Sequence, residues 1–220
     1  MLKRNKGTIL LTAAVTALPI LMGLLLWSRL PEQIPTHFGF NGEPDDWSSK
    51  AFAVFGLPLI LVGAHLLCAF GTMLDPKRRN IQDKMYRLVL WIIPVISILT
   101  CGAVYAYALG KAVDITLIAE LMVGIVFIVV GNYLPKCRQS YTMGIKIPWT
   151  LSDEDNWNAT HRFGGKVWIV GGVVFFVMTL LGSQYEVLGE FLTFGVIIAM
   201  VALPTVYSYL YYRKHHSDEE

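Results

Sequence analysis

The stretch VDITLIAELMVGIVFIVVGNYL, residues 113–134, decides the fold because a run this long and this apolar is typical of a membrane span. About 20 helical residues cross the ~30 Å hydrocarbon core of a bilayer. Among the 220 residues of the chain, 55% are hydrophobic and 15% are charged, too few polar residues to cover a soluble domain of this length. Five further runs have the same character: residues 9–27, 51–74, 88–109, 163–182 and 187–212. The sequence predicts an all-α membrane protein with six transmembrane helices.

The positions of the lysine and arginine residues predict how the chain is oriented. Most of the 18 basic residues lie in the N-terminal segment, in residues 75–87 and 135–166, and in the C-terminal tail. In a six-helix protein these four segments fall on one side of the bilayer, and the basic side normally stays in the cytoplasm. We therefore expect both termini and loop 135–166 in the cytoplasm, and loop 28–50 on the opposite side.

These two loops mark two halves of one integral membrane unit. Residues 1–110 form an N-terminal membrane half with the external loop 28–50, and residues 111–220 form a C-terminal half with the cytoplasmic loop 135–166. The three cysteines, at positions 68, 101 and 137, have unrelated spacings and no pattern that holds a metal. We expect no disulfide framework, no metal and no cofactor.

Loop 28–50 contains the segment LPEQIPTHFGFNGEPDDWSSK, residues 30–50, which predicts a compact folded cap. Its prolines at positions 31 and 35 exclude a regular helix. Asn41-Gly42 is a turn signal because both residues tolerate a positive φ, and residues 36–40 would supply an extended piece beside it. The polar residues of this cap are candidates for binding an external ligand: His37, Asn41, Gly42, Asp45 and Asp46. Their spacing matches no metal site, and Asp45 or Asp46 is expected to cap the second span.

Loop 135–166 gathers acids, tryptophans, a histidine and a Gly-Gly pair between two apolar runs. Thr150 or Ser152 is a good N-cap for a short helix from about Ser152 to His161. Residues 153–155 are acidic and fill its first turn, where the helix dipole favours negative charge. Trp157 and His161 recur at helical spacing before the Gly-Gly pair breaks the helix. We therefore expect a separate cytoplasmic interfacial helix between the fourth and fifth spans.

Two ionisable residues, Glu120 and His65, lie within the apolar runs. Burying them in lipid is costly, which makes them candidates for a proton or ligand site, although snorkelling or bonding to a neighbouring helix explains them equally well. Glu120 supports an alternative function as a small transporter or ion pathway. A membrane-embedded enzyme would use His161 as a base beside an acid, but no nucleophile motif accompanies it, so we expect no enzymatic activity.

The two polar loops resemble those of the SdpI-type immunity proteins, six-helix bacterial membrane proteins that protect cells from a secreted, membrane-active killing peptide. The resemblance covers nearly the whole chain, and both loops occur in the same order. Its most specific elements are GIKIPWTL, residues 144–151, and WNATHRF, residues 157–163. The founding member of this family is described as both an immunity protein and a receptor that holds a soluble repressor at the membrane.

The resemblance implies which partners and residues matter. The partners are the lipid bilayer of the bacterial cell membrane, a secreted toxin peptide and a cytoplasmic repressor protein, without direct binding to nucleic acid. The acidic residues 153–155 could contact a basic repressor, although helix capping explains them as well. We expect Trp149, Asn158 and Arg162 to matter more than Cys137 or Asn156. The cytoplasmic signature residues are Gly144, Pro148, Trp149, Thr150, Asp153, Trp157, Asn158, His161 and Arg162.

Overall fold

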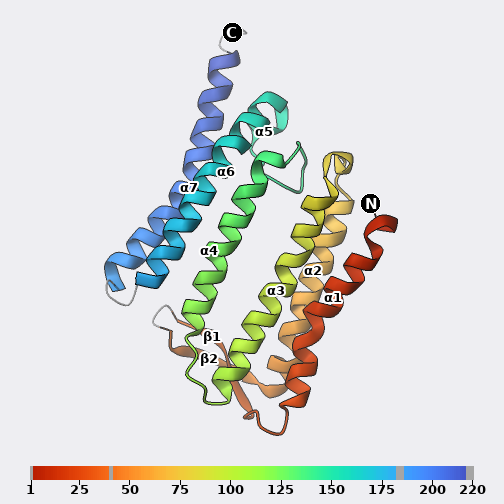
Figure 1. The fold of residues 1–220 in the computed structure, drawn as a ribbon, viewed down its shortest axis with the longest axis vertical. Helices are drawn as coiled ribbons and strands as arrows, with labels where there is room; N and C mark the ends of the chain where they lie inside the picture. Colours follow the sequence, from red (N-terminus) through yellow and green to blue (C-terminus); the bar gives the residue numbers. More distant parts are fainter. Residues whose placement is uncertain (1, 40–41, 182–185, 217–220) are drawn as a thin grey trace. The chain divides into compact units, whose positions relative to one another are not determined.

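The computed structural model describes residues 2–39, 42–181 and 186–216 and consists of long helices with one small β-hairpin (Figure 1). Within these residues, six helices are long and apolar enough to cross a membrane, which confirms the predicted number of spans. The six candidate spans are Arg4–Leu25, Phe52–Met73, Asp83–Ala108, Ile115–Lys136, Glu154–Leu181 and Leu192–His215. The elements in chain order are α1 (Leu2–Leu25), β1 (Gln33–Phe38), β2 (Pro44–Ser49), the π-helical turn η1 (Phe52–Gly56), α2 (Leu57–Met73), the 3-10 turn η2 (Arg78–Asn80), α3 (Asp83–Ala108), α4 (Ile115–Tyr133), the 3-10 turn η3 (Leu134–Lys136), α5 (Pro148–Ser152), α6 (Glu154–Leu181) and α7 (Glu186–His216).

The chain divides into two compact units, which we describe separately. The hairpin unit comprises Met1–Met73 and Tyr86–Ala119, and therefore holds α1, both strands, α2 and most of α3. The loop unit comprises Leu74–Met85 and Glu120–Glu220, and therefore holds most of α4 together with α5, α6 and α7. The connection between α2 and α3 thus belongs to the loop unit, although the two helices that it joins belong mainly to the hairpin unit.

In the hairpin unit, α1 turns a polar face inward and an apolar face outward. Asn5, Thr12 and Thr16 are fully buried, whereas Leu25 is 84% exposed. The Thr12 hydroxyl bonds the His65 imidazole of α2 at 3.0 Å, and the Ser97 hydroxyl of α3 donates to the Thr16 carbonyl at 2.8 Å. A soluble helix would place these side chains the other way round. The pattern is that of a helix whose outer surface meets lipid and whose neighbours satisfy its polar groups.

One end of the hairpin unit is closed by an apolar cluster that seats the hairpin. Ile34 of β1 is fully buried against Val54 at the start of the second span and Tyr105 of α3. The Tyr105 hydroxyl donates to the Ala53 carbonyl at 3.3 Å, so the cluster also satisfies a carbonyl near the π-helical turn. Phe38 packs against the same cluster and meets Tyr107 edge to face, with ring centroids 5.2 Å apart. These contacts fix the hairpin to the helix ends (Figure 1).

In the loop unit, α4 and α6 approach closely at glycine residues. A Cβ on Gly131 would lie 2.8 Å from the Ile169 backbone nitrogen, and one on Gly165 would lie 2.8 Å from the Gly131 carbonyl oxygen. About two helical turns away, a Cβ on Gly172 would lie 3.0 Å from the Gly124 carbonyl oxygen. Small residues at such positions let two membrane helices touch through their backbones.

The predicted helix from Ser152 to His161 is wrong in its bounds. The short helix between the fourth and fifth spans is α5, Pro148–Ser152, and the residues from Glu154 onward belong to the long helix α6. The Asp153 carboxylate caps α6 by accepting the Asp155 N–H at 2.8 Å. The Gly-Gly pair does not break the helix, because Gly165 packs against α4 as described above and Gly164 faces Ile145. Packing here overrides the weak helix propensity of glycine.

Candidate functional site

The hairpin forms the first polar site and is an antiparallel pair with two irregularities. Gln33 pairs with Ser49 at its base and Phe38 with Pro44 near its tip, with register shifts on either side of His37. Gly42 has a φ of 77°, which the predicted turn requires. Residues 36–38 of the expected extended segment lie in β1, while residue 40 and the candidate Asn41 lie outside the described residues.

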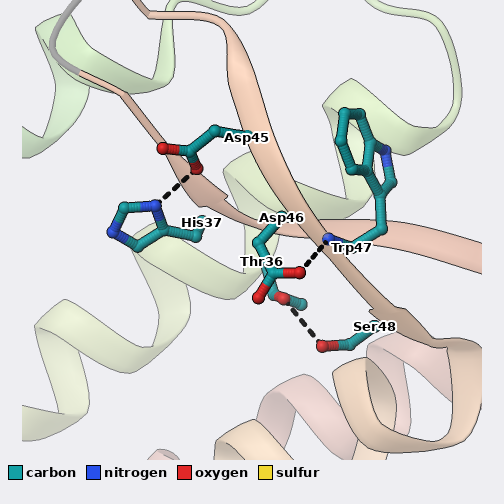
Figure 2. A network of polar contacts seen from close by, with 6 residues as sticks. All are labelled: Thr36, His37, Asp45, Asp46, Trp47 and Ser48. Atoms are coloured by element: carbon teal, nitrogen blue, oxygen red, sulfur yellow. Dashed lines mark hydrogen bonds and ion pairs between the residues drawn. The ribbon is translucent and has the colours of Figure 1, made fainter.

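Exposed and half-buried polar side chains make three separate contacts along this hairpin (Figure 2). His37 Nδ1 and the Asp45 carboxylate are 2.5 Å apart, and both side chains are more than half exposed. The hydrogen bond to Asp45, and then the charge of that carboxylate, raise the pKa of His37 above its ordinary value. Beside them, Thr36 bonds Ser48 at 2.8 Å. The Asp46 carboxylate accepts the Trp47 N–H at 2.9 Å, and Trp47 is 51% exposed.

The base of the hairpin is anchored by Lys50, which is 7% exposed. Its ammonium group donates to the Glu32 carboxylate at 2.8 Å and to the Trp27 carbonyl at 3.3 Å. The expected capping of the second span by Asp45 or Asp46 is wrong. Ser49 supplies that cap by accepting the Phe52 N–H at 3.2 Å, because both aspartates are held within the hairpin.

The second site is loop 135–166, which we call the signature loop, and His161 lies at its centre. The imidazole is 1% exposed and stacks on Trp157 with ring centroids 4.0 Å apart. Its Nε2 accepts the Ile145 N–H at 2.8 Å, so the proton sits on Nδ1 and is donated to the Trp157 carbonyl at 2.7 Å. Both nitrogens are thus bonded to backbone groups and neither to the acids of residues 153–155. The arrangement holds a loop in place and offers no base to a substrate.

Gly144 is required by this arrangement. Its φ is 106°, a conformation that side chains rarely adopt. A Cβ at this position would lie 2.4 Å from His161 Nε2 and 2.8 Å from the Trp157 ring. Trp157 itself is fully buried and donates its indole N–H to the Cys137 carbonyl at 2.8 Å. The glycine therefore lets the loop backbone lie directly on the aromatic pair.

Thr150 ties α5 to the loop that precedes it. Its buried hydroxyl donates to the Ile145 carbonyl at 2.7 Å and accepts the Ile147 N–H at 3.1 Å. The Gln139 amide then donates to the Thr150 and Leu151 carbonyls, at 2.8 and 3.0 Å. The final turn of α5 is thereby joined to the segment directly after α4.

Asp75 lies in the connection between α2 and α3, and its hydrogen bonds hold the signature loop in place. Its carboxylate is 1% exposed and accepts the N–H groups of Tyr141 and Thr142, each at 2.9 Å, and the Thr142 hydroxyl at 2.7 Å. The Lys77 N–H donates to the other oxygen at 2.7 Å. Burial alone would raise the pKa of Asp75, but these hydrogen bonds outweigh it and hold the pKa below its ordinary value. The carboxylate is therefore charged at neutral pH.

Asn156 joins α6 to α7. Its side chain is fully buried, and its amide donates to the Ser208 carbonyl at 2.9 Å. Its oxygen accepts both the Ser208 hydroxyl at 2.7 Å and the Thr160 hydroxyl at 2.9 Å. Among the described residues, no buried side-chain polar atom lacks a partner. Such a fully bonded buried network specifies one arrangement of its helices.

The other predicted signature residues lie at the surface of this network. Pro148, Asn158 and Arg162 are exposed, and Asp153 caps α6 as described above. Trp149 is half-buried and packs on Tyr209 of α7 with ring centroids 5.2 Å apart. Pro148, Asn158 and Arg162 are thus accessible at the surface, whereas the buried members hold the loop.

The two ionisable residues within the spans have different surroundings. His65 is 1% exposed and bonds Thr12, so it serves as a contact between α1 and α2. Glu120 is half-buried on α4, and its carboxylate makes no hydrogen bond or ion pair with the residues that the structure describes. No group of three or more metal-ligating side chains occurs in the described part of the chain.

Sequence reasoning missed four residues that build the signature loop. Asn156 could have been found, because it precedes Thr160 by four residues and both therefore lie on one helix face. Asp75 stands alone among basic residues directly after an apolar run, which is a weaker signal. Gln139 and Ser208 carry no local signal, since only the folded structure shows their partners.

Six apolar helices carrying two folded polar segments define a multi-pass membrane protein. The SdpI/YfhL protein family matches residues 136–208, and a domain of unknown function, DUF1648, matches residues 14–62. The first match covers most of the signature loop, and the second contains the hairpin.

Comparison with curated proteins gives a relative along nearly the full length. Immunity protein SdpI of Bacillus subtilis (strain 168) is 28% identical over 209 residues, 93% of this chain and 96% of that protein. An uncharacterized protein of Archaeoglobus fulgidus is 47% identical over 46 residues, 21% of this chain and 25% of that protein. No solved structure matches the chain. These matches confirm the resemblance to the SdpI-type immunity proteins that was expected from the sequence.

Proposed function

We propose that this protein gives the cell immunity to a secreted, membrane-active peptide toxin. The observation that carries this proposal is the similarity to Immunity protein SdpI over 93% of the chain, which includes both polar segments. The six apolar helices support it, because a protein that counters a membrane-active peptide has to reside where the peptide acts.

Both termini and the signature loop then face the cytoplasm, and the hairpin faces outward. The basic residues support this orientation, because they gather in the four segments on the side of the signature loop. The hairpin is the part placed to meet the toxin. Its exposed carboxylates and the half-exposed Trp47 form an acidic and aromatic surface, which suits a peptide that carries basic and apolar side chains.

A second role follows from the same family, that of a receptor which recruits a cytoplasmic repressor. Exposed residues of the signature loop support this role. Asn158 and Arg162 are exposed on the first turns of α6, and the acidic residues 153–155 lie beside them. A rigid loop with an acidic edge suits a basic soluble partner. Toxin binding would change the affinity for that partner if the protein has two packings.

Survival of a toxin-sensitive strain that produces this protein tests the immunity. We expect protection at the toxin concentration that kills the parent strain, and loss of protection in a Trp47→Ala, Asp45→Asn variant present at equal abundance in the membrane. Lys111→Gln is the matched control, because it alters an exposed residue of the hairpin unit outside the hairpin. Unchanged killing with wild-type protein in the membrane would refute immunity for this member of the family.

Labelling of single cysteines in intact cells tests the orientation separately. Cys68 is exposed and is first replaced by serine. A cysteine at Ser48, in the hairpin, should react with an impermeant maleimide, and one at Asp153 should react only after the cells are opened. The reverse pattern would overturn the orientation while leaving the fold unaffected.

A further inference from the structure

A surface of the loop unit that neither the hairpin nor the signature residues explain is built from two basic segments. Residues 74–85 and 136–146 are joined by hydrogen bonds from the Thr142 hydroxyl to the Asp75 carboxylate at 2.7 Å, from the Asn80 amide to the Gln139 carbonyl at 2.8 Å, and from the Gln82 amide to the Lys136 carbonyl at 3.2 Å. The two segments are therefore one rigid body, which we call the basic clamp. Its exposed basic residues are Arg78, Arg79, Lys84, Lys136, Arg138 and Lys146.

The charges of the basic clamp are not neutralised within the described part of the chain. None of its six exposed basic side chains forms an ion pair there. Only two acids occur in these segments, and Asp75 is buried and fully bonded to the loop. A folded surface with this density of unpaired positive charge attracts anions.

The basic clamp lies where apolar helices end. Residues 74–85 directly join the span that ends at Met73 to the span that begins with α3, and residues 136–146 directly follow the span that ends at Lys136. Aromatic side chains accompany the charges, as is typical of a membrane interface. The Lys136 ammonium lies 4.8 Å from the centre of the Tyr133 ring, and Tyr141 is 48% exposed.

We propose that the basic clamp binds the head groups of anionic phospholipids. Arginine matches the phosphate oxygens with two parallel hydrogen bonds, and the clamp holds its arginines on a backbone fixed by Asp75 and Gln139. The position at the helix ends favours lipid over a soluble acidic protein, because head groups are present there at high concentration. This inference requires only that the six helices cross a membrane, and it is independent of immunity.

Retention of lipid by the purified full-length protein tests the proposal. The protein is extracted in neutral detergent, loaded with an equal mixture of phosphatidylglycerol and phosphatidylcholine, and analysed by native mass spectrometry. We expect preferential retention of phosphatidylglycerol that weakens as salt is added. Because each basic residue near a membrane surface contributes about a fivefold preference, the variant R78Q/R79Q/R138Q should bind phosphatidylglycerol about 100-fold more weakly.

The matched control removes the same charge elsewhere in the loop unit, in the variant K166Q/R213Q/K214Q. It should keep the preference of the wild-type protein, and both variants should unfold at the wild-type temperature in detergent without lipid. Equal losses in the two variants would overturn the proposal, because net charge and not the clamp would then be responsible. Full retention of phosphatidylglycerol by R78Q/R79Q/R138Q would overturn the proposal as well. So would binding of polyglutamate, used as a soluble acidic probe, by a wild-type protein that shows no preference between the two lipids.

Discussion

Replacing Asp75 by alanine should release the signature loop from the connection between α2 and α3. The substitution removes the acceptor for four hydrogen bonds, three from backbone N–H groups and one from the Thr142 hydroxyl. Hydrogen bonds to a charged group contribute about 1.5–3 kcal/mol each, and bonds that share one acceptor are not additive. We expect a local destabilisation of about 4 kcal/mol.

The chain contains a natural probe of this release. Cys137 is 6% exposed and lies in the signature loop, and burial raises the pKa of its thiol to about 11. Since about 1.4 kcal/mol corresponds to a factor of ten, its rate of labelling should rise about 700-fold in Asp75→Ala. Cys101 is buried in the hairpin unit and serves as an internal reference. Cys68 is exposed and is replaced by serine beforehand.

Two further variants make the measurement specific. Asp75→Asn keeps an oxygen for the bonds from residues 141 and 142 but sets an amide against the Lys77 N–H, so it should cost about 2 kcal/mol. Asp155→Asn changes an exposed acid of the same unit and should have no effect. An unchanged labelling rate of Cys137 in Asp75→Ala would refute the reasoning. Equal acceleration of Cys101 would also refute it, because the effect would then be global.

The pH dependence of the same labelling follows from the pKa of Asp75. That pKa lies below its ordinary value of 3.8 in the folded protein, so the carboxylate contributes stability above the ordinary value. The contribution is lost as the pH falls through the lower, folded value. A dipyridyl disulfide reacts with thiols in acid and should show protection of Cys137 falling in the wild-type protein but not in Asp75→Asn. Parallel profiles would assign the loss to other groups.

Three shorter predictions concern both polar sites. Gly144→Ala should lower the free energy of unfolding by about 3 kcal/mol, because a φ of 106° strains any residue with a side chain and the new methyl group meets a buried ring. The control Gly63→Ala meets nothing within 4 Å. Equal unfolding temperatures of the two variants would contradict this prediction. Asn156→Ala should cost about 2–3 kcal/mol in the same measurement, and Asn158→Ala, at an exposed position, less than about 0.5 kcal/mol; the reverse order would show that the buried network is dispensable. An NMR titration should place the pKa of His37 above 6.5, and Asp45→Asn should return it towards 6.5. The pair therefore stabilises the hairpin below pH 6.5 and loses its effect as the pH rises through the raised pKa. An unshifted pKa in both proteins would mean that the pair is not formed.

The spans and the hairpin could be predicted because their signals are local. A run such as residues 113–134 is long and apolar within one continuous segment, and no contact with another part of the chain is needed to recognise it. The hairpin was equally accessible, because prolines excluded a helix and Gly42 marked the turn. The cap of the second span could not be predicted, because Asp45 was equally suited to cap that span and to bond His37. Only the register of the strands decides between these partners.

The signature loop was harder because its contacts join distant segments. The Gly-Gly pair at positions 164 and 165 predicts a helix break by propensity, yet helix α6 continues through it since Gly165 packs on α4. Asp75 and Thr142 lie far apart in the sequence, and no periodicity relates them. The sequence singled out Asn158 and Arg162, which are exposed, over Asn156, which is buried. Whether exposed or buried residues matter more for protection stays a prediction.

The backbone contacts between α4 and α6 have a consequence for motion. Where Gly131 faces Gly165, the two helix backbones are in direct contact, so neither helix can come closer to the other without a clash. Displacing either helix would open an empty space that neither lipid nor water can readily fill. We therefore expect the two helices to move as one unit and to carry with them the histidine, tryptophan and asparagine side chains at the start of α6. A shift transmitted across the bilayer would reach them with little loss of amplitude.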